Sequence, residues 1–371
     1  MQIPPFTLER YFARHEFSAK YLFSSSDCES LTLPELLDMA SPEMRRTFFN
    51  LKLGYTESMG HPQLRAEAAA IYDGIDAEHV LISAPEEAIF LLMNALLQPG
   101  DHVISTFPGY QSLYEIARSL GCQVSTWEPV EAAEWHFDLA RLEQVITPQT
   151  KLVVANFPHN PTGYIPSHAE FDQMIGMLRE RGIYLLSDEM YRFLEIETGA
   201  TLPSACEAYE RAFTLFGMSK TFGLPGLRIG WIATQDAATL ARMLELKDYT
   251  TICSSAPSEI LSIIALQNKQ RIIDMQNARL KRNFALLDEF FTTRPERFTL
   301  NRPRGGSICF PRMLGVESTL AFADKIVAEA GIMLAPSHVF DYGDQHFRMG
   351  FGRENFGEVL GLFGEYVDDM F

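Results

Sequence analysis

The stretch Gly217-Met-Ser-Lys-Thr-Phe-Gly-Leu-Pro-Gly-Leu-Arg-Ile-Gly-Trp231 places Lys220 among small residues, eight positions before Arg228. An amine becomes a useful nucleophile toward a carbonyl when burial or a neighbouring cation disfavours its charge. The apolar residues after Lys220 and the guanidinium of Arg228 supply both conditions. The pattern therefore predicts a lysine that forms a Schiff base with a carbonyl compound.

Short apolar runs rich in strand-forming residues surround this stretch, and segments with helical periodicity, such as 168–180, separate them. The runs are 79–83, 102–106, 123–127, 151–156, 183–188, 212–217 and 229–234. Such alternation is typical of a mostly parallel sheet with helices on both faces. Because ligands bind outside the carboxyl ends of strands in such sheets, we expect the functional site at this edge.

The remainder of the chain has a different pattern. A long helical pattern covers 258–291, and shorter strand and helix signals follow at 305–310, 319–330, 346–351 and 357–370. We interpret 50–255 as a large α/β domain, and 1–49 together with 256–371 as a smaller α+β domain with an N-terminal arm. No internal repeat or low-complexity segment interrupts the sequence. We expect the two domains to pack around one cleft.

Composition and charge exclude several classes of function. The 371-residue chain carries a formal net charge of −17, which argues against nucleic acid and anionic membranes as partners. No uninterrupted apolar run is long enough to cross a bilayer. The first residues, MQIPPFTLERYF, contain charges where a secretion signal needs an apolar core. Five cysteines stand far apart in no metal-ligand spacing, so we expect a cytoplasmic protein without a metal site.

Polar residues that a plain turn does not need follow two of the apolar runs. Asn160, in Asn156-Phe-Pro-His-Asn-Pro-Thr-Gly163, offers an amide that can donate to a phenolate-like oxygen. Asp188 ends a run, where a carboxylate is costly unless a cation such as a protonated pyridine nitrogen pairs with it. Tyr191 can bring its hydroxyl to the same ring. Without Lys220, we would prefer a helix cap for Asp188 and plain packing for Tyr191.

The candidate residues occur in the order found in class I and II aminotransferases, the pyridoxal-phosphate enzymes of fold type I, and the chain resembles that family. They are Asn160, Asp188, Tyr191, Lys220, Arg228 and Arg348. The resemblance runs from about Gly54 to Arg353. It implies an α/β fold with a large domain, built on a mostly parallel seven-stranded sheet flanked by helices, and a smaller α+β domain. It also implies pyridoxal 5′-phosphate as the cofactor.

The resemblance assigns catalytic and cofactor-binding roles to four of these residues. Lys220 would form the Schiff base and then move the proton between the substrate Cα and the cofactor as general acid and base. Asp188 would keep the pyridine nitrogen protonated. Asn160 and Tyr191 would bind the ring oxygen, and Asn160 would also lie against the substrate.

Four further positions match family residues around the cofactor and the substrate. Arg228 would bind the cofactor phosphate, and Arg348 would grip the substrate α-carboxylate bidentately. Phe107 matches the aromatic residue that stacks on the cofactor ring, although core packing is the commoner fate of a phenylalanine after a strand. Tyr55 matches the tyrosine that reaches the phosphate from the neighbouring subunit, which implies a homodimer.

The chain departs from the family pattern around the phosphate. The segment Ser83-Ala-Pro-Glu-Glu-Ala88 stands where relatives have a glycine-rich turn whose backbone amides bind the anion. Pro85 has no N–H, so the amide of Glu86 must serve, and the Glu86 side chain competes with phosphate unless it points away. Gly217 stands where many relatives carry a phosphate-binding serine, and Ser219 would replace only part of that contact.

The motifs leave the outcome of the reaction open, because transamination, elimination, racemisation and cyclisation all begin at the same Cα proton. We favour transamination between an L-amino acid and a 2-keto acid, the commonest activity in the family. The polar segment Phe23-Ser-Ser-Ser-Asp-Cys-Glu29 is either a surface turn or a contact for a polar or basic side chain. The second possibility keeps open a lyase or cyclase similar to capreomycidine synthase. A cofactor-sensing, non-catalytic regulator is a remote alternative, because no basic recognition helix precedes Gly54.

Overall fold

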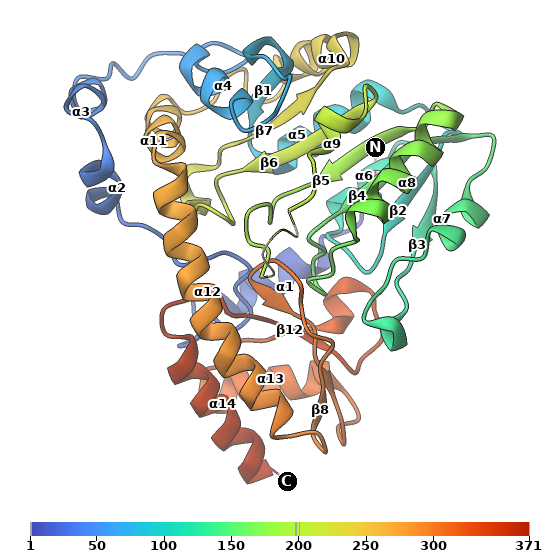
Figure 1. Cartoon of the computed structure of the whole chain (residues 1–371). Coiled ribbons are helices and arrows are strands. Elements are labelled where there is room, and N and C mark those ends of the chain that lie inside the picture. Colours follow the sequence, from blue (N-terminus) through green and yellow to red (C-terminus); the bar gives the residue numbers. More distant parts are fainter. Residues whose placement is uncertain (1, 197–198, 200, 371) are drawn as a thin grey trace.

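The structure of the protein is a computed structural model that describes residues 2–196, 199 and 201–370 (Figure 1). A seven-stranded sheet in the order β1-β7-β6-β5-β4-β2-β3 forms its centre. The strands are β1 (Val80–Ser83), β2 (His102–Thr106), β3 (Gln123–Trp127), β4 (Thr150–Asn156), β5 (Tyr184–Asp188), β6 (Ala212–Gly217) and β7 (Gly230–Thr234). Only β7 runs antiparallel to its neighbours β1 and β6. The predicted α/β fold with a mostly parallel seven-stranded sheet is therefore confirmed.

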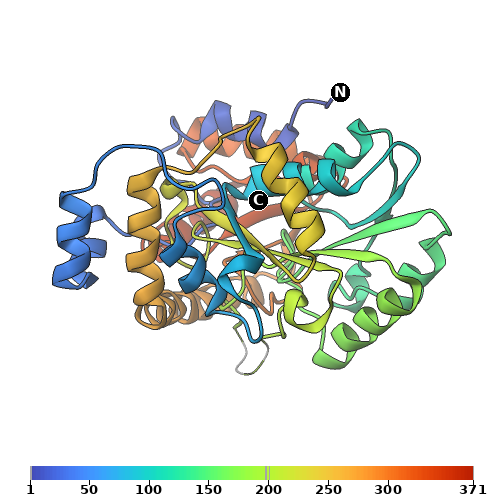
Figure 2. The same ribbon diagram turned by 90° about the horizontal axis from the view of Figure 1, so that it is seen from above.

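Helices cover both faces of this sheet, and Figure 2 shows it between two helical layers. One face carries α5 (Pro85–Leu96), α6 (Ser112–Ser119) and α10 (Ala237–Lys247). The other face carries α4 (Pro62–Ala69), α7 (Leu139–Val145), α8 (His168–Arg181), α9 (Ala205–Ala208) and α11 (Ala256–Gln267). Every residue of β1, β2, β6 and β7 is buried, as expected for strands covered on both faces.

The sequence at the ends of α8 explains why this helix begins and stops where it does. The Ser167 hydroxyl accepts a hydrogen bond from the Glu170 amide at 3.2 Å, and the Glu170 carboxylate accepts one from the Ser167 amide at 2.7 Å. This reciprocal capping box satisfies two amides that have no partner inside the helix. Gly182 follows with φ +64°, the left-handed conformation in which helices commonly end.

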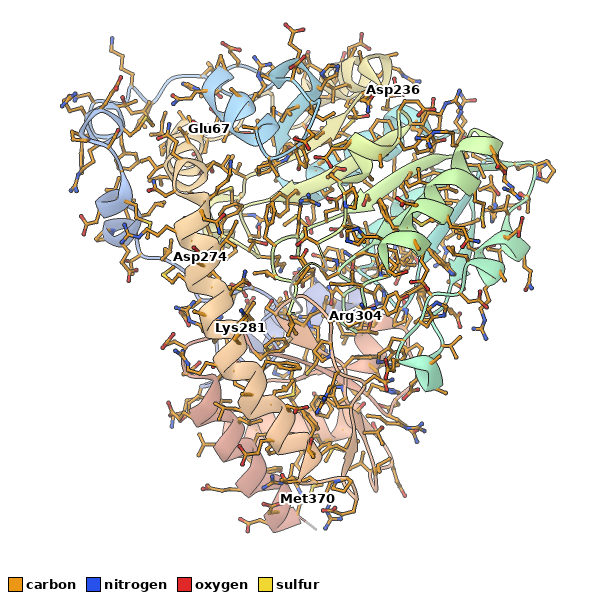
Figure 3. The ribbon with its side chains drawn as sticks, viewed as in Figure 1. Glu67, Asp236, Asp274, Lys281, Arg304 and Met370 are labelled. Atoms are coloured by element: carbon orange, nitrogen blue, oxygen red, sulfur yellow. The ribbon has the colours of Figure 1, made fainter. Side chains whose placement is uncertain are left out.

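A smaller part of the molecule follows the sheet. Its helices are α12 (Lys269–Thr292), α13 (Thr319–Ala330) and α14 (Phe356–Met370). β10 (Arg312–Met313) pairs with β8 (Phe298–Thr299), and β12 (Phe347–Gly350) lies between β11 (Ala335–Pro336) and β9 (Ile308–Cys309). Short 3₁₀ helices cover Ala77–His79, Glu131–Ala133, Pro225–Leu227 and Ser337–Phe340. In Figure 3, Asp274 and Lys281 of α12 lie on the outer surface.

The prediction of one continuous helix over 258–291 is wrong, because α11 and α12 meet at Asn268. Asn268 has φ −112° and ψ 21°, outside the helical region. Its side-chain amide donates to the Ile264 carbonyl at 2.8 Å. Asparagine side chains compete with the backbone for hydrogen bonds in this way, which explains the break.

The N-terminal segment joins the two parts of the molecule. α1 (Thr7–His15) buries Leu8 and Tyr11 in a cluster with Phe310 and Phe340 of the smaller part. Farther along, the Tyr21 amide donates to the Gly331 carbonyl at 2.9 Å. α2 (Leu33–Met39) and α3 (Pro42–Phe49) then project from the molecule at the left of Figure 1. In the described part of the chain, no helix combines the length and apolar character that a membrane span requires.

Candidate active site

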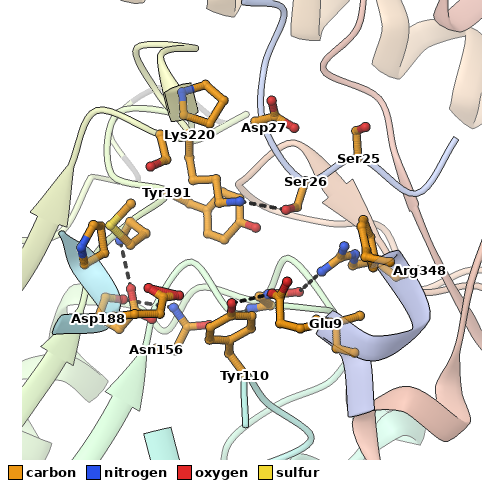
Figure 4. A pocket seen from close by; sticks show the side chains of 18 of the residues that line it. Glu9, Ser25, Ser26, Asp27, Tyr110, Asn156, Asp188, Tyr191, Lys220 and Arg348 are labelled. Atoms are coloured by element: carbon orange, nitrogen blue, oxygen red, sulfur yellow. Dashed lines mark hydrogen bonds between the residues drawn. The ribbon is translucent and has the colours of Figure 1, made fainter. Parts of the chain in front are cut away.

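A cavity of about 550 Å³ lies at the carboxyl ends of the central strands (Figure 4). Asp188 ends β5 and Asn156 ends β4, while Lys220 follows β6 by three residues. Arg348 enters from β12 of the smaller part, and α1 contributes Glu9. The site therefore combines the edge of the large sheet with side chains from both the N-terminal and C-terminal segments.

Most residues predicted for the site line this one cavity. They are Pro85, Glu86, Asn160, Asp188, Tyr191, Ser219, Lys220, Arg228 and Arg348. Phe107 and Tyr55 do not line the cavity of their own chain. Residues up to 263 positions apart in sequence thus meet because strand ends converge there.

Lys220 is half-buried, and its Nζ donates a hydrogen bond to the Ser26 hydroxyl at 2.7 Å. The same nitrogen lies 6.0 Å from the centre of the Tyr191 ring. The turn after Lys220 packs tightly: a Cβ at Gly223, which has φ +61°, would lie 2.3 Å from the Glu29 carbonyl oxygen. The lysine is thereby held between the end of β6 and the segment 23–29.

Asp188 is buried without a cationic partner among the described residues. Its Oδ1 accepts a hydrogen bond from the Met190 amide at 3.1 Å. Burial raises the pKa of Asp188 to about 7, and the Glu86 charge adds to the rise. Because a buried carboxylate is costly without a positive charge, the site fits a ligand that brings one, as a protonated pyridine nitrogen would.

The hydroxyl of Tyr191 is buried and has no hydrogen-bond partner among the described residues. Asn160 faces the same cavity, and its backbone amide donates to the Asn156 side-chain oxygen at 2.8 Å. The Asn156 amide group donates in turn to the Asp188 carbonyl at 3.0 Å. Asn156 thus ties the ends of β4 and β5 together, a positioning role that the sequence motif did not reveal.

Arg348 is a buried guanidinium, 2% exposed, whose described partners are neutral. Its Nη1 donates to the Asn160 side-chain oxygen at 3.2 Å and its Nη2 to the Ser24 carbonyl at 3.0 Å. Its Nε has no partner, and burial lowers the pKa of the group. The rings of Phe12 and Phe340 lie 5.7 and 5.3 Å from its Cζ. The arrangement fits a carboxylate brought by a ligand.

The N-terminus of α5 lies at the cavity, which Pro85 and Glu86 line. The Glu87 side chain points elsewhere, since it accepts hydrogen bonds from the hydroxyls of Thr250 and Thr251. The Glu86 side chain lines the cavity instead. Burial raises the pKa of Glu86, while a hydrogen bond with Tyr110 and the charge of Arg228 oppose that rise.

Gly217 cannot be replaced by the serine of relatives without a structural shift. A Cβ at Gly217 would lie 2.8 Å from the Gly230 Cα and 2.9 Å from the Ile229 carbonyl oxygen. A Cβ at Gly230 would in turn lie 2.9 Å from the Pro85 ring. The close approach of β6, β7 and α5 therefore excludes a side chain there, and Ser219 is the hydroxyl that reaches the cavity.

The structure places Tyr110, rather than Phe107, at the cavity wall. The Phe107 amide donates to the Trp127 carbonyl at 3.0 Å, which extends the pairing of β2 with β3, and its ring packs on Tyr114. Tyr110 lies three residues later and donates its hydroxyl to Glu9 Oε1 at 2.6 Å (Figure 4). Phe107 and Tyr110 lie in one short stretch of the sequence, and the path of the turn decides which of them lines the cavity.

The segment 23–29 is not a surface turn. Ser24, Ser25 and Cys28 are buried, and a Cβ at Gly350 would lie 1.7 Å from the Ser25 carbonyl oxygen. Ser25, Ser26 and Asp27 line the cavity. The interpretation of this segment as an exposed turn is therefore wrong, and its polar side chains belong to the site.

These features fit pyridoxal 5′-phosphate. Asp188 and the Tyr191 hydroxyl lack partners that the pyridine nitrogen and the ring oxygen would supply. The first turn of α5, Ser219 and Arg228 lie where an anionic group needs donors, while Glu86 is the one unfavourable residue there. Lys220 supplies the amine, and the unpaired Arg348 supplies a site for a carboxylate.

Comparison with known proteins agrees with this chemistry. The family model described as aminotransferase class I and II matches residues 20–356. A pyridoxal-phosphate-dependent aminotransferase structure from Streptococcus suis superposes with a TM-score of 0.93, at 32% identity, covering 100% of this chain and 99% of that one.

Curated relatives point to two kinds of reaction. Capreomycidine synthase from Streptomyces vinaceus is 28% identical over 94% of this chain and 90% of its own length. Aspartate aminotransferase from Sulfolobus acidocaldarius is 27% identical over 80% of this chain and 78% of its own length. The family model covers most of the sequence, and the family uses pyridoxal phosphate. The chain is therefore an enzyme of the class I and II aminotransferase family, with fold type I.

Proposed function

We propose that the protein transfers the amino group of an L-amino acid to a 2-keto acid. This proposal rests on one observation: the Lys220 amine and the buried Arg348 guanidinium line the same cavity. The described hydrogen-bond partners of Arg348 are all neutral. An α-amino acid has the matching carboxylate beside the carbon that must lose a proton. The similarity to aminotransferases along nearly the whole chain supports the same conclusion.

Pyridoxal phosphate supplies an aldehyde that condenses with amines and a ring that withdraws electrons from the substrate Cα. In our proposal, Arg348 holds the α-carboxylate and thereby orients the Cα proton toward the Lys220 Nζ. Lys220 would take that proton and, as general acid, would deliver it to the bound cofactor. Asp188 would hold the pyridine nitrogen in its protonated form, and Asn160 and Tyr191 would hold the ring oxygen.

We further propose that the active unit is a homodimer in which Tyr55 reaches the phosphate of the partner subunit. Tyr55 is 91% exposed and makes no contact with the cavity of its own chain. Its neighbours Phe49 and Leu53 are also exposed. A group of exposed apolar side chains on a projecting arm is typical of a surface that a second subunit covers.

The test is to mix the cofactor-loaded protein with a panel of L-amino acids in the absence of keto acid. Conversion of the cofactor to its amine form, with one equivalent of 2-keto acid, is the expected result, and added 2-keto acid should restore the aldehyde form. Lys220→Ala should bind cofactor without this conversion. Turnover by Lys220→Ala would remove the lysine from its proposed role.

A lyase or cyclase acting on a polar or basic amino acid is the second candidate. Two observations favour it: capreomycidine synthase matches 94% of the chain, and the polar segment 23–29 contributes Ser26 and Asp27 to the cavity. This reaction would leave the cofactor in its aldehyde form and release ammonia or a cyclised product. Product analysis in the same experiment separates the two candidates.

A further inference from the structure

One face of α1 presents two carboxylates to the cavity. Glu9, Phe12 and Glu16 all line it, and their spacing of three and four residues puts them on one side of the helix. Asp27 lines the same region from the segment 23–29. The two arginines of the helix, Arg10 and Arg14, are exposed and do not line the cavity. The helix thus turns its acidic face inward.

Among the described residues, no cation of the site forms an ion pair with Glu9 or Glu16. Arg353 donates to Asp27 at 2.8 Å and lies 3.7 Å from Glu29, so it is engaged by these two acids. Glu9 receives only the neutral hydroxyl of Tyr110. Glu16 has no hydrogen bond or ion pair to any side chain in the described part of the chain. Its carboxylate therefore lines the cavity without a direct partner, and the charges of Arg353 and Lys220 act on it only from farther away.

Local electrostatics make the position of Glu16 unfavourable for a negative charge. Burial and the charges of Glu9 and Asp27 raise the pKa of its carboxyl by more than the charges of Arg353 and Lys220 lower it. Glu16 is also the C-cap of α1, where the partial negative charge of the helix end adds to theirs. A positive group bound in this region would stabilise the Glu16 carboxylate against burial, the neighbouring acids and the helix end.

A second observation indicates what brings that group. Arg348, on the same cavity, is buried with an unpaired Nε and neutral partners, so it requires a ligand carboxylate. Phe12 lies between the two acids in sequence, and its ring is 5.7 Å from the Arg348 Cζ. The carboxylate site and the acidic face are therefore adjacent. One ligand with a carboxylate at one end and a cation at the other satisfies both.

We infer that the amino-acid substrate has a positively charged side chain, and that Glu16, assisted by Glu9, recognises this charge. The inference rests on the proposed function, because it assumes that the α-carboxylate binds at Arg348. Both a guanidinium and an ammonium group meet the requirement. Glu16 determines specificity and takes no part in the proton transfer at Cα.

The test compares ligands of similar carbon skeleton and different charge on the cofactor-loaded protein. L-Arginine and L-citrulline form one pair, and L-lysine and L-norleucine form another. Dissociation constants follow from the change in the cofactor absorbance. The wild type should prefer the cationic member of at least one pair by about tenfold or more, and the preferred pair identifies a guanidinium or an ammonium.

Two variants locate the effect. Glu16→Gln should reduce that preference about tenfold, whereas Glu43→Gln, which removes the same charge from the exposed first turn of α3, should preserve it. Equal binding of charged and neutral members by the wild type overturns the inference, as does a preference that survives in Glu16→Gln. If neutral amino acids are converted well, the proposed function stands and only the inference fails. If no amino acid changes the cofactor spectrum, the proposed function itself fails.

Discussion

Arg348 carries a buried positive charge whose partners, the Asn160 side-chain oxygen and the Ser24 carbonyl, are neutral. Replacement by methionine, which is unbranched and uncharged, should weaken amino-acid binding by about 2–5 kcal/mol because it removes a buried charge pair. Titration of the loaded protein, followed through the cofactor absorbance, measures this loss. Binding of the matching amine without a carboxylate should change little, and an equal loss for both ligands would contradict the assignment.

Glu86 lines the cavity where we expect the cofactor phosphate to bind, and burial raises the pKa of its carboxyl. A phosphate dianion favours the neutral acid, so cofactor affinity should fall as the pH rises through the pKa of Glu86. Glu86→Gln stays neutral and should remove this fall, with about tenfold tighter binding at pH 8. Calorimetry with pyridoxamine 5′-phosphate measures the affinity without a reaction at Lys220.

The matched control for this prediction is Glu87→Gln. It removes the same charge one residue later, from a side chain that Thr250 and Thr251 hold away from the cavity. Its pH profile should follow that of the wild type. If Glu86→Gln and Glu87→Gln behave alike, the Glu86 side chain does not meet the phosphate.

At the scale of elements, the close contact of β6 with β7 leaves no room for a side chain at Gly217. Gly217→Ser, which installs the serine of many relatives, should lower the free energy of unfolding by about 1–3 kcal/mol through overpacking. It should not tighten cofactor binding. Gly226→Ser is the control, because a Cβ at Gly226 has open space around it. Denaturant unfolding of both variants measures the difference, and a stable, tighter-binding Gly217→Ser would refute this account.

Elements with strong local signals were predictable from the sequence. The seven strands coincide to within a residue with the seven runs seen in the sequence, and α8 is defined by Ser167 with Glu170 at one end and Gly182 at the other. The break at Asn268 was missed, because an apolar helical pattern continues across it. The place of Tyr110 at the cavity wall was missed as well, because it depends on how one turn leaves the end of β2. The stacking role of Phe107 stays a prediction.

The site residues of α1 could not be predicted from the sequence, for a different reason. Glu9 and Glu16 belong to no motif, and they reach the site because α1 lies over strand ends that come about a hundred residues or more later in the chain. Asn156 similarly acquires its role from the pairing of β4 with β5. Such residues are determined by tertiary packing, whereas Lys220, Asp188 and Arg348 are recognisable from their immediate sequence. The immediate sequence therefore marks the residues that we assign to the reaction centre, whereas tertiary packing places those that we assign to substrate specificity.

At the scale of the whole molecule, the projecting arm of α2 and α3 and the exposed residues after it require an explanation. Leu53→Asp should shift the protein from dimer to monomer, because it places a charge in the apolar surface that we assign to the partner. Phe17→Asp is the control, since Phe17 is equally exposed but lies at the end of α1. Sedimentation at micromolar concentration measures the change. A monomeric wild type, or a Leu53→Asp protein that remains dimeric, contradicts the assignment.

The division into residues 50–255 and residues 1–49 with 256–371 also belongs to this scale, and it stays a prediction. Segment 20–29 packs with the C-terminal part, as the Gly350 amide donating to the Phe23 carbonyl at 2.8 Å illustrates. α11 begins at the proposed boundary, yet its side chains join the cluster around β1 and β7. We therefore expect any relative motion of the two parts to hinge near Asn268 rather than before α11.

The central claim is that Lys220 catalyses transfer of an amino group, and isotope transfer tests it most directly. The cofactor-loaded protein is mixed with an amino acid labelled with ¹⁵N at the α-nitrogen, without keto acid, and the products are analysed by mass spectrometry. The account predicts that the label moves to the cofactor with one equivalent of 2-keto acid, and that Lys220→Ala shows no transfer. Label released as ammonia or retained in a cyclised product, with the cofactor unlabelled, would contradict it.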